Sequence, residues 1–343
     1  MKFKLTLCIG VVLISSCQFS NNHSNKKELV LTLGAYTVPK EVYHKELIPA
    51  FQEYWLKEKG QHVKFEESYM ASGAQSRAIS AGFEADIAAL SLEKDIDCLV
   101  EKGLIVHDWK KSKYNGFVTR SVVVIVFREG NPKRIKDWID LTDKNVSVVY
   151  PSPKTSGGAM WDICAIYGAG LMESERKTGK KDYDYARDLL KSIQKNVKVM
   201  DKSGRASVTT FENGIGDALI TYENEAILRQ KSGRRMNYII PRSTILIENP
   251  IAVIDKNVDK HKNREVANAF VAFALSFESQ KTFARYGFRP VDDQCAKEFI
   301  MQYPVPENLF GIGYLGGWDT VYKTVFGMDG IWNEIISELA NEK

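Results

Sequence analysis

The sequence predicts an α/β protein of two lobes with a ligand cleft between them. Strand patterns alternate with helix patterns along the chain, which is typical of α/β folds with largely parallel sheets. Two apolar strands, at 121–127 and 250–255, bracket a middle block of the same alternation and predict two crossings between lobes. The 343 residues suffice for two buried cores, and 44% hydrophobic with 26% charged residues indicates a globular chain rather than a disordered one. Ligands of open α/β sheets usually bind in such an inter-lobe crevice.

The N-terminus predicts export and lipid attachment. Two lysines precede a short apolar stretch at 5–14, which is too short to span a bilayer and is typical of a secretory signal. Ile-Ser-Ser-Cys at 14–17 resembles the lipobox of bacterial lipoproteins, in which the cysteine becomes the acylated first residue. We therefore expect a signal peptide over 1–17, acylation of Cys17 and a flexible polar tether over 18–27. An ordinary signal peptide with an incidental cysteine is the alternative.

Lobe I is expected to combine residues 28–119 with 249–343. Its first strand, 29–33, is followed by an amphipathic helix at 42–57, in which apolar residues recur at helical spacing. The further elements expected in this lobe are a strand at 63–65, a helix at 72–81 that ends at Gly82, a strand at 85–90, a helix at 95–101, a strand at 250–255 and helices at 264–286 and 318–339.

Lobe II is assigned to residues 120–248, where the alternation begins again. Its expected elements are strands at 121–127, 146–150, 197–200 and 218–222, helices at 160–167 and 183–196, and a helix that ends at Asn213. Glu223 and Glu225 are expected in the strand after Tyr222, in the region between the lobes.

The segment Pro-Lys-Thr-Ser-Gly-Gly-Ala-Met-Trp at 153–161 predicts an anion-binding turn. It follows an apolar strand and opens a buried helix, so free N–H groups lie at the positive end of the helix dipole. Such a turn binds an oxyanion without lysine or arginine. The lysine that a nucleotide-binding P-loop places after its last glycine is absent, which favours a small anion.

Two further turns share this arrangement. Ser72, which we place at an N-cap, precedes Gly73 after a strand, and Ser203-Gly204 follows another strand and opens a helix. One Ser-Gly helix start is an ordinary cap. Because three of them stand at the carboxyl ends of strands in both lobes, we expect them to converge on one cleft.

Seven segments carry a resemblance to a known family. The chain resembles the sulfate-binding proteins of bacterial sulfate/thiosulfate ABC importers over almost all of its mature length. The matching segments are Phe-Glu-Ala-Asp at 83–86, Gly-Asn-Pro-Lys at 130–133, Lys-Asp-Trp at 136–138, residues 153–161, residues 214–220 with Glu-Asn-Glu at 223–225, Phe-Arg-Pro at 288–290 and Gly-Gly-Trp at 316–318. The resemblance implies the bilobed type II periplasmic-binding-protein fold, with a two-crossing hinge around the cleft. It also implies a lipid-anchored monomer of the cell envelope that captures sulfate and delivers it to an ABC permease.

The resemblance also implies the ligand contacts. In that family, backbone N–H groups, hydroxyls and one indole N–H hold dehydrated sulfate without a charged side chain in contact. The implied contacts here are the hydroxyl and N–H of Ser72, the hydroxyl of Ser156 and the N–H groups of Gly157, Gly158 and Gly204. Arg205 is implied beside the site, where it orients the loop through a carboxylate.

Some positions depart from the family pattern. Tyr222 stands where the family has the tryptophan that donates, and its hydroxyl reaches differently. The first turn, residues 36–39, is one residue longer than the family's, and Thr37 is a further contact there. Met70 and Ala71 replace two glycines before Ser72. These changes leave thiosulfate, molybdate and phosphate open as ligands.

The remaining signals favour a receptor over an enzyme. Sulfate is fully ionised and needs only donors, whereas a protonated phosphate needs an acceptor, and none of the three turns offers a carboxylate in the ligand position. No GxSxG, HExxH or Cys/His pairing is present. A net charge of +4 from scattered lysines and arginines, without a nucleic-acid module, argues against a nucleic-acid partner. We expect no cofactor and no metal; a hydrolase or an interaction lipoprotein on the same fold is the alternative.

Overall fold

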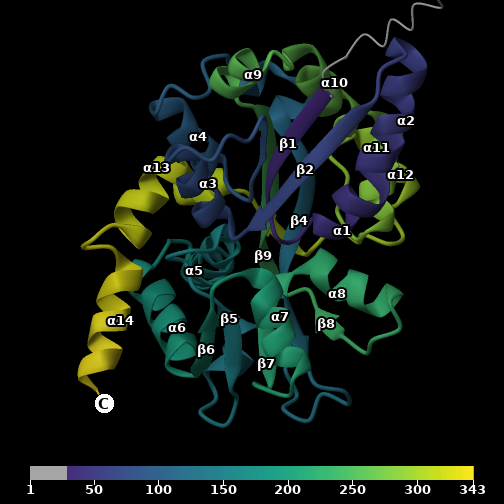
Figure 1. Ribbon diagram of the computed structural model, residues 1–343. Helices are drawn as coiled ribbons and strands as arrows, with labels where there is room; N and C mark the ends of the chain where they lie inside the picture. The colour runs from purple at the N-terminus through teal and green to yellow at the C-terminus, as the bar shows by residue number, and fades with distance from the viewer. Residues whose placement is uncertain (1–28, 343) are drawn as a thin grey trace, which may run out of the picture.

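The computed structural model describes residues 29–342 (Figure 1). The predicted signal peptide, the lipobox Cys17 and the tether lie outside the described residues. Within the described part, eight strands of a ten-stranded sheet follow one another in the order β2-β1-β3-β9-β4-β7-β5-β6, and the other two, β10 and β8, pair with β9 and β4. No helix of this part is long and apolar enough to span a bilayer.

The first half of the sheet is parallel. β1 (Leu29–Tyr36) pairs with β2 (Val63–Met70) on one side and β3 (Ile87–Ala89) on the other. The helices that follow these strands are α1 (Lys40–Val42), which continues through a π-helical segment (Tyr43–Leu47) into α2 (Ile48–Lys59), then α3 (Ser72–Ser80) and α4 (Glu93–Glu101). Because the strands are parallel, their carboxyl ends meet at one edge, facing the second half.

The second half repeats this arrangement. β5 (Val148–Pro151) pairs in parallel with β6 (Val197–Asp201) and β7 (Ala218–Tyr222). Its helices are α5 (Gly157–Thr178), α6 (Tyr183–Lys195), α7 (Gly204–Glu212) and α8 (Glu223–Lys231), preceded by a 3₁₀ segment at Trp138–Thr142. Two further 3₁₀ segments, Trp109–Lys111 and Lys113–Gly116, lie between α4 and β4. The Ser-Gly turns that open α5 and α7 again lie at the carboxyl edge.

Two long strands join the halves. β4 (Phe117–Phe127) pairs antiparallel with β9 (Ser243–Val253) along its first part and with β7 along its second part, while the end of β9 pairs with β3. Every side chain at 122–126 of β4 is fully buried, as expected for an apolar run covered on both faces. The expectation of largely parallel sheets is therefore wrong at the centre. A chain that crosses into the second half and returns must run in opposite directions at the two crossings.

Several predicted elements differ in detail. The helix expected at 264–286 is divided into α10 (Arg264–Ala274) and α11 (Phe277–Arg285), because Ser276 caps the second helix by accepting from the N–H of Ser279 at 3.3 Å. Glu223 and Glu225 open α8 rather than extend a strand. The elements that the patterns did not indicate are β8 (Asn237–Ile239), β10 (Asn308–Phe310), α9 (Asp255–His261) and α12 (Asp293–Glu298).

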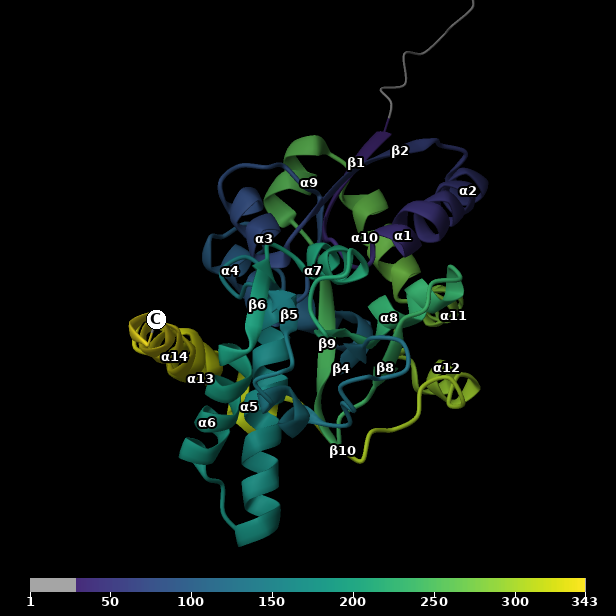
Figure 2. The same cartoon turned by 90° about the horizontal axis from the view of Figure 1, so that it is seen from below.

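The C-terminal segment runs along both halves (Figures 1 and 2). A 3₁₀ turn (Ile312–Leu315) leads into α13 (Gly317–Val321), which contacts α4, and a π-helical segment (Tyr322–Phe326) leads to α14 (Ile331–Asn341). α14 packs against α6, where Lys191 lies 2.9 Å from both Glu338 and Glu342. The division of the chain at 119/120 and 248/249 stays a prediction, and this segment, expected in lobe I, contacts the second half as well.

Candidate anion-binding site

A small cavity lies where the carboxyl edges of the two half-sheets face each other. Its volume is about 20 Å³, and a single water needs roughly 10–15 Å³ on this measure, so only a compact ligand fits in this conformation. The lining residues are Tyr36, Thr37, Val38, Ala71, Ser72, Pro151, Ser156, Gly158, Asp162, Gly204, Thr221 and Tyr222. The structure thus brings all the predicted contact residues to one cavity except Gly157, which lies beside it.

The start of α5 forms one wall. Ser156 is its N-cap, and the hydroxyl oxygen accepts from the N–H of Ala159 at 3.4 Å, which leaves the hydroxyl proton for another acceptor. The N–H groups of the first turn, at Gly157 and Gly158, have no partner within the helix. A Cβ on Gly157 would stand 2.8 Å from Cγ of Leu92, so only glycine lets α5 approach the turn after β3 this closely.

The start of α3 differs from the prediction. Ala71 is the N-cap and Ser72 is the first helical residue. The Ser72 hydroxyl donates to Oδ2 of Asp95 at 2.5 Å and accepts from the N–H of Ser91 at 2.8 Å. Its only proton is therefore directed at Asp95, and the predicted N-cap role is wrong. The backbone N–H of Ser72 is the donor that this turn offers. Burial raises the pKa of Asp95 to about 6, while its bond from Ser72 opposes the rise.

At the start of α7, hydrogen bonds of Arg205 join the two halves. Ser203 is the N-cap of α7 and Gly204 its first residue. Arg205 donates through Nη2 to Oε2 of Glu41 at 2.9 Å and through Nε to Oε1 of the fully buried Glu225 at 3.1 Å. Nη2 also reaches the carbonyl of Val38 at 3.1 Å. Arg205 thus holds the start of α7 against the segment after β1 and does not line the cavity.

Ser91, which the sequence patterns did not indicate, links Ser72 of α3, Trp161 of α5 and Tyr222 of β7. Its N–H donates to Ser72, and its hydroxyl lies 2.7 Å from the hydroxyl of Tyr222. Its carbonyl accepts from Nε1 of Trp161 at 2.9 Å and from Nδ2 of Asn249 at 3.0 Å. The Tyr222 hydroxyl is therefore already hydrogen-bonded, and burial raises the pKa of this phenol well above its usual range. A lone serine after β3 carries no motif, so only its three-dimensional neighbours reveal it.

Asp162 is the second residue that the sequence patterns missed. It lies one turn after Gly158 on α5, its side chain lines the cavity, and it is 1% exposed. The oxygen Oδ1 has no hydrogen-bond partner, and neither has the buried hydroxyl of Tyr36 on the opposite wall. Burial raises the pKa of Asp162 well above its usual range. The expectation that none of the three turns offers a carboxylate did not include this residue, which helical geometry returns to the face of Gly158 from the following turn of α5.

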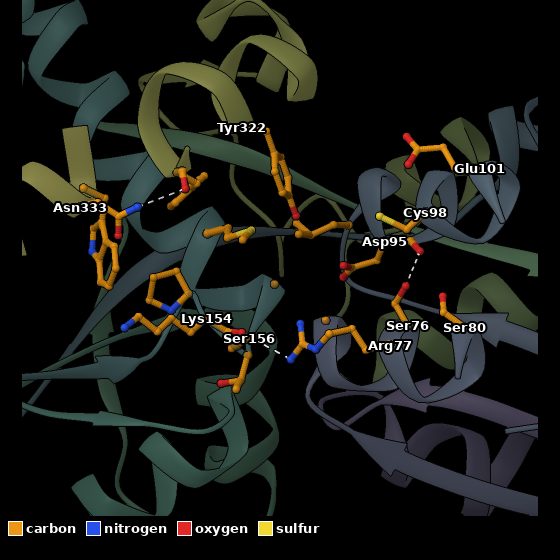
Figure 3. A pocket seen from close by; sticks show the side chains of 18 of the residues that line it. Ser76, Arg77, Ser80, Asp95, Cys98, Glu101, Lys154, Ser156, Tyr322 and Asn333 are labelled. Atoms are coloured by element: carbon orange, nitrogen blue, oxygen red, sulfur yellow. Dashed lines mark hydrogen bonds between the residues drawn. The ribbon is translucent and has the colours of Figure 1, made fainter. Parts of the chain in front are cut away.

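A larger cavity of about 570 Å³ lies on the other side of the Ser156–Gly157 turn (Figure 3). The close-up shows Arg77 reaching toward the loop before α5, where its Nη2 lies 3.4 Å from the carbonyl of Lys154. Charged groups of both signs line this cavity, among them Asp95. It lacks the three converging helix starts, so the small cavity is the candidate site.

Residues 29–342 contain neither a metal-binding cluster nor a thiol with a lowered pKa. No group of three or more His, Cys, Asp or Glu in this range could hold a metal ion. The cysteines of this range, Cys98, Cys164 and Cys295, are free. Burial raises the pKa of Cys164 above its usual range and that of Cys295 to about 11, so both thiols stay protonated at neutral pH.

Comparisons with known proteins agree over nearly the whole chain. The family model described as bacterial extracellular solute-binding protein matches residues 31–289. A sulfate-binding protein of Synechococcus elongatus is 39% identical over 333 residues, which is 96% of this chain and 93% of the relative. The sulfate-binding protein of Escherichia coli is 35% identical over 90% of this chain and 93% of its own. A thiosulfate-binding protein of Pseudomonas aeruginosa is also 35% identical, over 88% and 91%.

Solved structures give the same picture. The sulfate-binding protein SubI from Mycobacterium tuberculosis superimposes with a TM-score of 0.79 at 37% identity, covering 88% of this chain and 100% of that one. A periplasmic thiamin binding protein, at 15% identity and a TM-score of 0.62, shares the fold alone.

Proposed function

The chain belongs to the family of bacterial extracellular solute-binding proteins, and from this premise we propose that it is the sulfate receptor of an ABC importer. The observation that carries the proposal is the convergence of three helix starts, from both halves of the molecule, on one small buried cavity. Similarity to sulfate-binding proteins over nearly the full length supports the same ligand.

The donor set suits a fully ionised oxyanion. The N–H groups of Ser72, Gly157, Gly158 and Gly204 stand in first helical turns, where the dipoles favour negative charge. The Ser156 hydroxyl adds a donor. Hydrogen bonds to an ionised acceptor are about twice as strong as neutral ones, so a few fixed donors replace the hydration shell of a dianion. No lysine, arginine or histidine lines the cavity.

Capture rests on closure of the two halves. The first half supplies the start of α3, and the second half supplies the starts of α5 and α7. Rotation about β4 and β9 separates them, so all the donors contact the ligand only in the closed form. The ligand therefore stabilises that form, and closure is what a permease recognises. Binding involves no covalent step.

Thiosulfate is the second candidate ligand. A thiosulfate-binding protein reaches 35% identity, close to the values for sulfate-binding proteins, and both anions are tetrahedral and fully ionised. The hydroxyl of Tyr222, which lies 2.7 Å from the hydroxyl of Ser91, stands in place of an indole N–H and changes one side of the cavity.

We further propose that Cys17 is acylated and holds the receptor at the outer face of a membrane of the cell envelope. The lipobox-like segment 14–17 and the polar tether after it support this. Replacement of Cys17 by serine releases the protein from the membrane fraction and abolishes incorporation of labelled fatty acid. Retention of label in Cys17→Ser contradicts the anchor.

The deciding experiment is isothermal titration of the protein lacking residues 1–27 with sulfate, thiosulfate, molybdate and phosphate. Tight one-to-one binding of sulfate, without heat from phosphate, is the expected result. If only thiosulfate binds, the protein is a thiosulfate receptor rather than a sulfate receptor. Absence of binding for all four anions refutes the receptor proposal.

A further inference from the structure

The carboxyl group of Asp162 is an unusual group to find in the lining of an anion-binding cavity, because an ionised carboxylate repels an anion. It is 1% exposed, its Oδ1 has no partner, and its side chain lines the cavity one turn after Gly158. A carboxylate oxygen left in this state loses its hydration without any compensating hydrogen bond, which is costly for an ionised group. Asp162 is therefore expected either to be protonated and neutral, or to accept a hydrogen bond from a proton carried by the ligand.

The groups around Asp162 provide no positive charge. The other polar side chains that line the cavity are those of Tyr36, Thr37, Ser72, Ser156, Thr221 and Tyr222, all neutral. Tyr150 of β5 and Cys164 of α5 are close enough for its charge to raise the pKa of each. Charged residues next to the lining residues in the chain or hydrogen-bonded to them are already paired: Arg205 with Glu41 and Glu225, Glu223 with Arg289, and Asp95 with Ser72. Burial, with no opposing cation, raises the pKa of Asp162 well above its usual range.

Resting on the proposed function, we propose that Asp162 determines the specificity of this site as a protonated acid whose O–H donates a hydrogen bond to the bound dianion. A neutral carboxyl carries one O–H donor, which a fully ionised oxyanion accepts. The proton comes from solvent and stays on Asp162 when the anion binds, so no covalent bond changes. This donor is additional to the N–H groups of the three helix starts.

The ionised form of Asp162 has the opposite preference. A carboxylate accepts only, so it repels sulfate and suits an anion that still carries a proton, such as hydrogen phosphate. The complex with sulfate therefore holds at least as many protons as the free protein. By linkage, sulfate affinity falls as pH rises through the range between the pKa of Asp162 in the free protein and in the complex, by up to about tenfold per pH unit.

The test uses the sulfate complex of the protein lacking residues 1–27, with two variants. Asp162→Asn keeps a donor in the same place and cannot titrate. Asp95→Asn is the matched control, because Asp95 is a second buried carboxyl near the site, bonded to Ser72, and its pKa is raised to about 6. Infrared spectra at pH 8 with saturating sodium sulfate report the C=O stretch of a protonated acid. Titration calorimetry between pH 5 and 9, in buffers of different ionisation enthalpy, counts the protons taken up.

We expect the band of a protonated acid in the wild-type complex and in Asp95→Asn, and its loss in Asp162→Asn. The dissociation constant for sulfate in Asp162→Asn should be independent of pH. A wild-type complex without the band overturns the inference, as does a band that survives in Asp162→Asn or disappears in Asp95→Asn. Binding of phosphate with ionised Asp162 also overturns it. Because each spectrum is recorded on a sulfate complex, a protein that binds no sulfate refutes the proposed function instead and is recognised as such by calorimetry.

Discussion

Gly157 is the position where the structure makes the sharpest prediction. A Cβ built there would stand 2.8 Å from Cγ of Leu92 and 3.0 Å from Oγ of Ser91, although Gly157 opens α5 in the second half and the other two residues belong to the first. To relieve this close contact, the two halves must move apart by several tenths of an ångström. The substitution Gly157→Ala therefore disfavours closure, and closure is the step that completes the site.

The magnitude follows from the cost of overpacking. An added methyl group in a well-packed contact costs about 1–3 kcal/mol. This cost falls on the closed form alone, because the contact with Leu92 and Ser91 opens when the halves separate. The dissociation constant for sulfate should therefore rise by about 5- to 150-fold, while the free energy of unfolding of the ligand-free, open protein changes little. Gly157→Asp adds a larger side chain and a negative charge at the same contact, next to the cavity-lining Ser156 and Gly158, and should abolish binding.

Titration calorimetry with sulfate and denaturant unfolding without it separate the two effects. Gly313→Ala is the matched control, because a Cβ on Gly313 would meet nothing within 4 Å, and it should bind sulfate like the wild type. Wild-type affinity in Gly157→Ala would refute the reasoning, since it would mean that the two halves do not need to approach this closely. A loss of stability equal to the loss of affinity would refute it as well.

Three further perturbations test separate parts of the site. Ser156→Ala should weaken sulfate binding by about 1–3 kcal/mol in calorimetry, because the anion loses a buried donor; an unchanged dissociation constant would mean that the hydroxyl points elsewhere. Arg205→Ala leaves the fully buried Glu225 without its closest cation and should lower the free energy of unfolding in urea by about 3 kcal/mol, the low end for an orphaned buried charge, because Arg229 remains 3.5 Å away. Equal midpoints for the two proteins would contradict that role. Burial raises the pKa of Asp95 from 3.8 to about 6, so the folded state holds its proton more tightly than the unfolded state, and ionisation costs stability as pH rises through this window. Relative to Asp95→Asn, the wild type should lose about 2 kcal/mol between pH 4 and 6, and a pH-independent difference in urea would argue against a buried acid at this position.

Two of the three helix starts were predictable because capping is local. Ser156 and Ser203 accept from N–H groups three residues ahead, so the Ser-Gly pattern after an apolar strand suffices to indicate them. Ser72 has the same local pattern but a different role. Its hydroxyl contacts Asp95, 23 residues away, and a buried carboxylate is a better acceptor for its proton than any local group. A tertiary partner thus overrides a local preference.

The centre of the sheet shows the same limit. Each strand was visible as an apolar run, but the antiparallel pairing of β4 with β9 joins residues that stand more than a hundred positions apart. Helix α10 ends near Leu275 because Ser276 caps its successor, a signal that an unbroken apolar periodicity concealed.

Sequence alone determined the features that depend on neighbours along the chain: the alternation of strands and helices, the glycine-rich helix starts, and hence the attraction of this protein for a small anion. Tertiary structure decided which of these features meet. It brought Ser91 into contact with Ser72, Trp161 and Tyr222, turned the Ser72 proton toward Asp95, and placed Asp162 at the cavity with its Oδ1 unpartnered. The physical reason is that dipoles and caps act within one helical turn, whereas hydrogen-bond partners and desolvation depend on every segment that packs nearby.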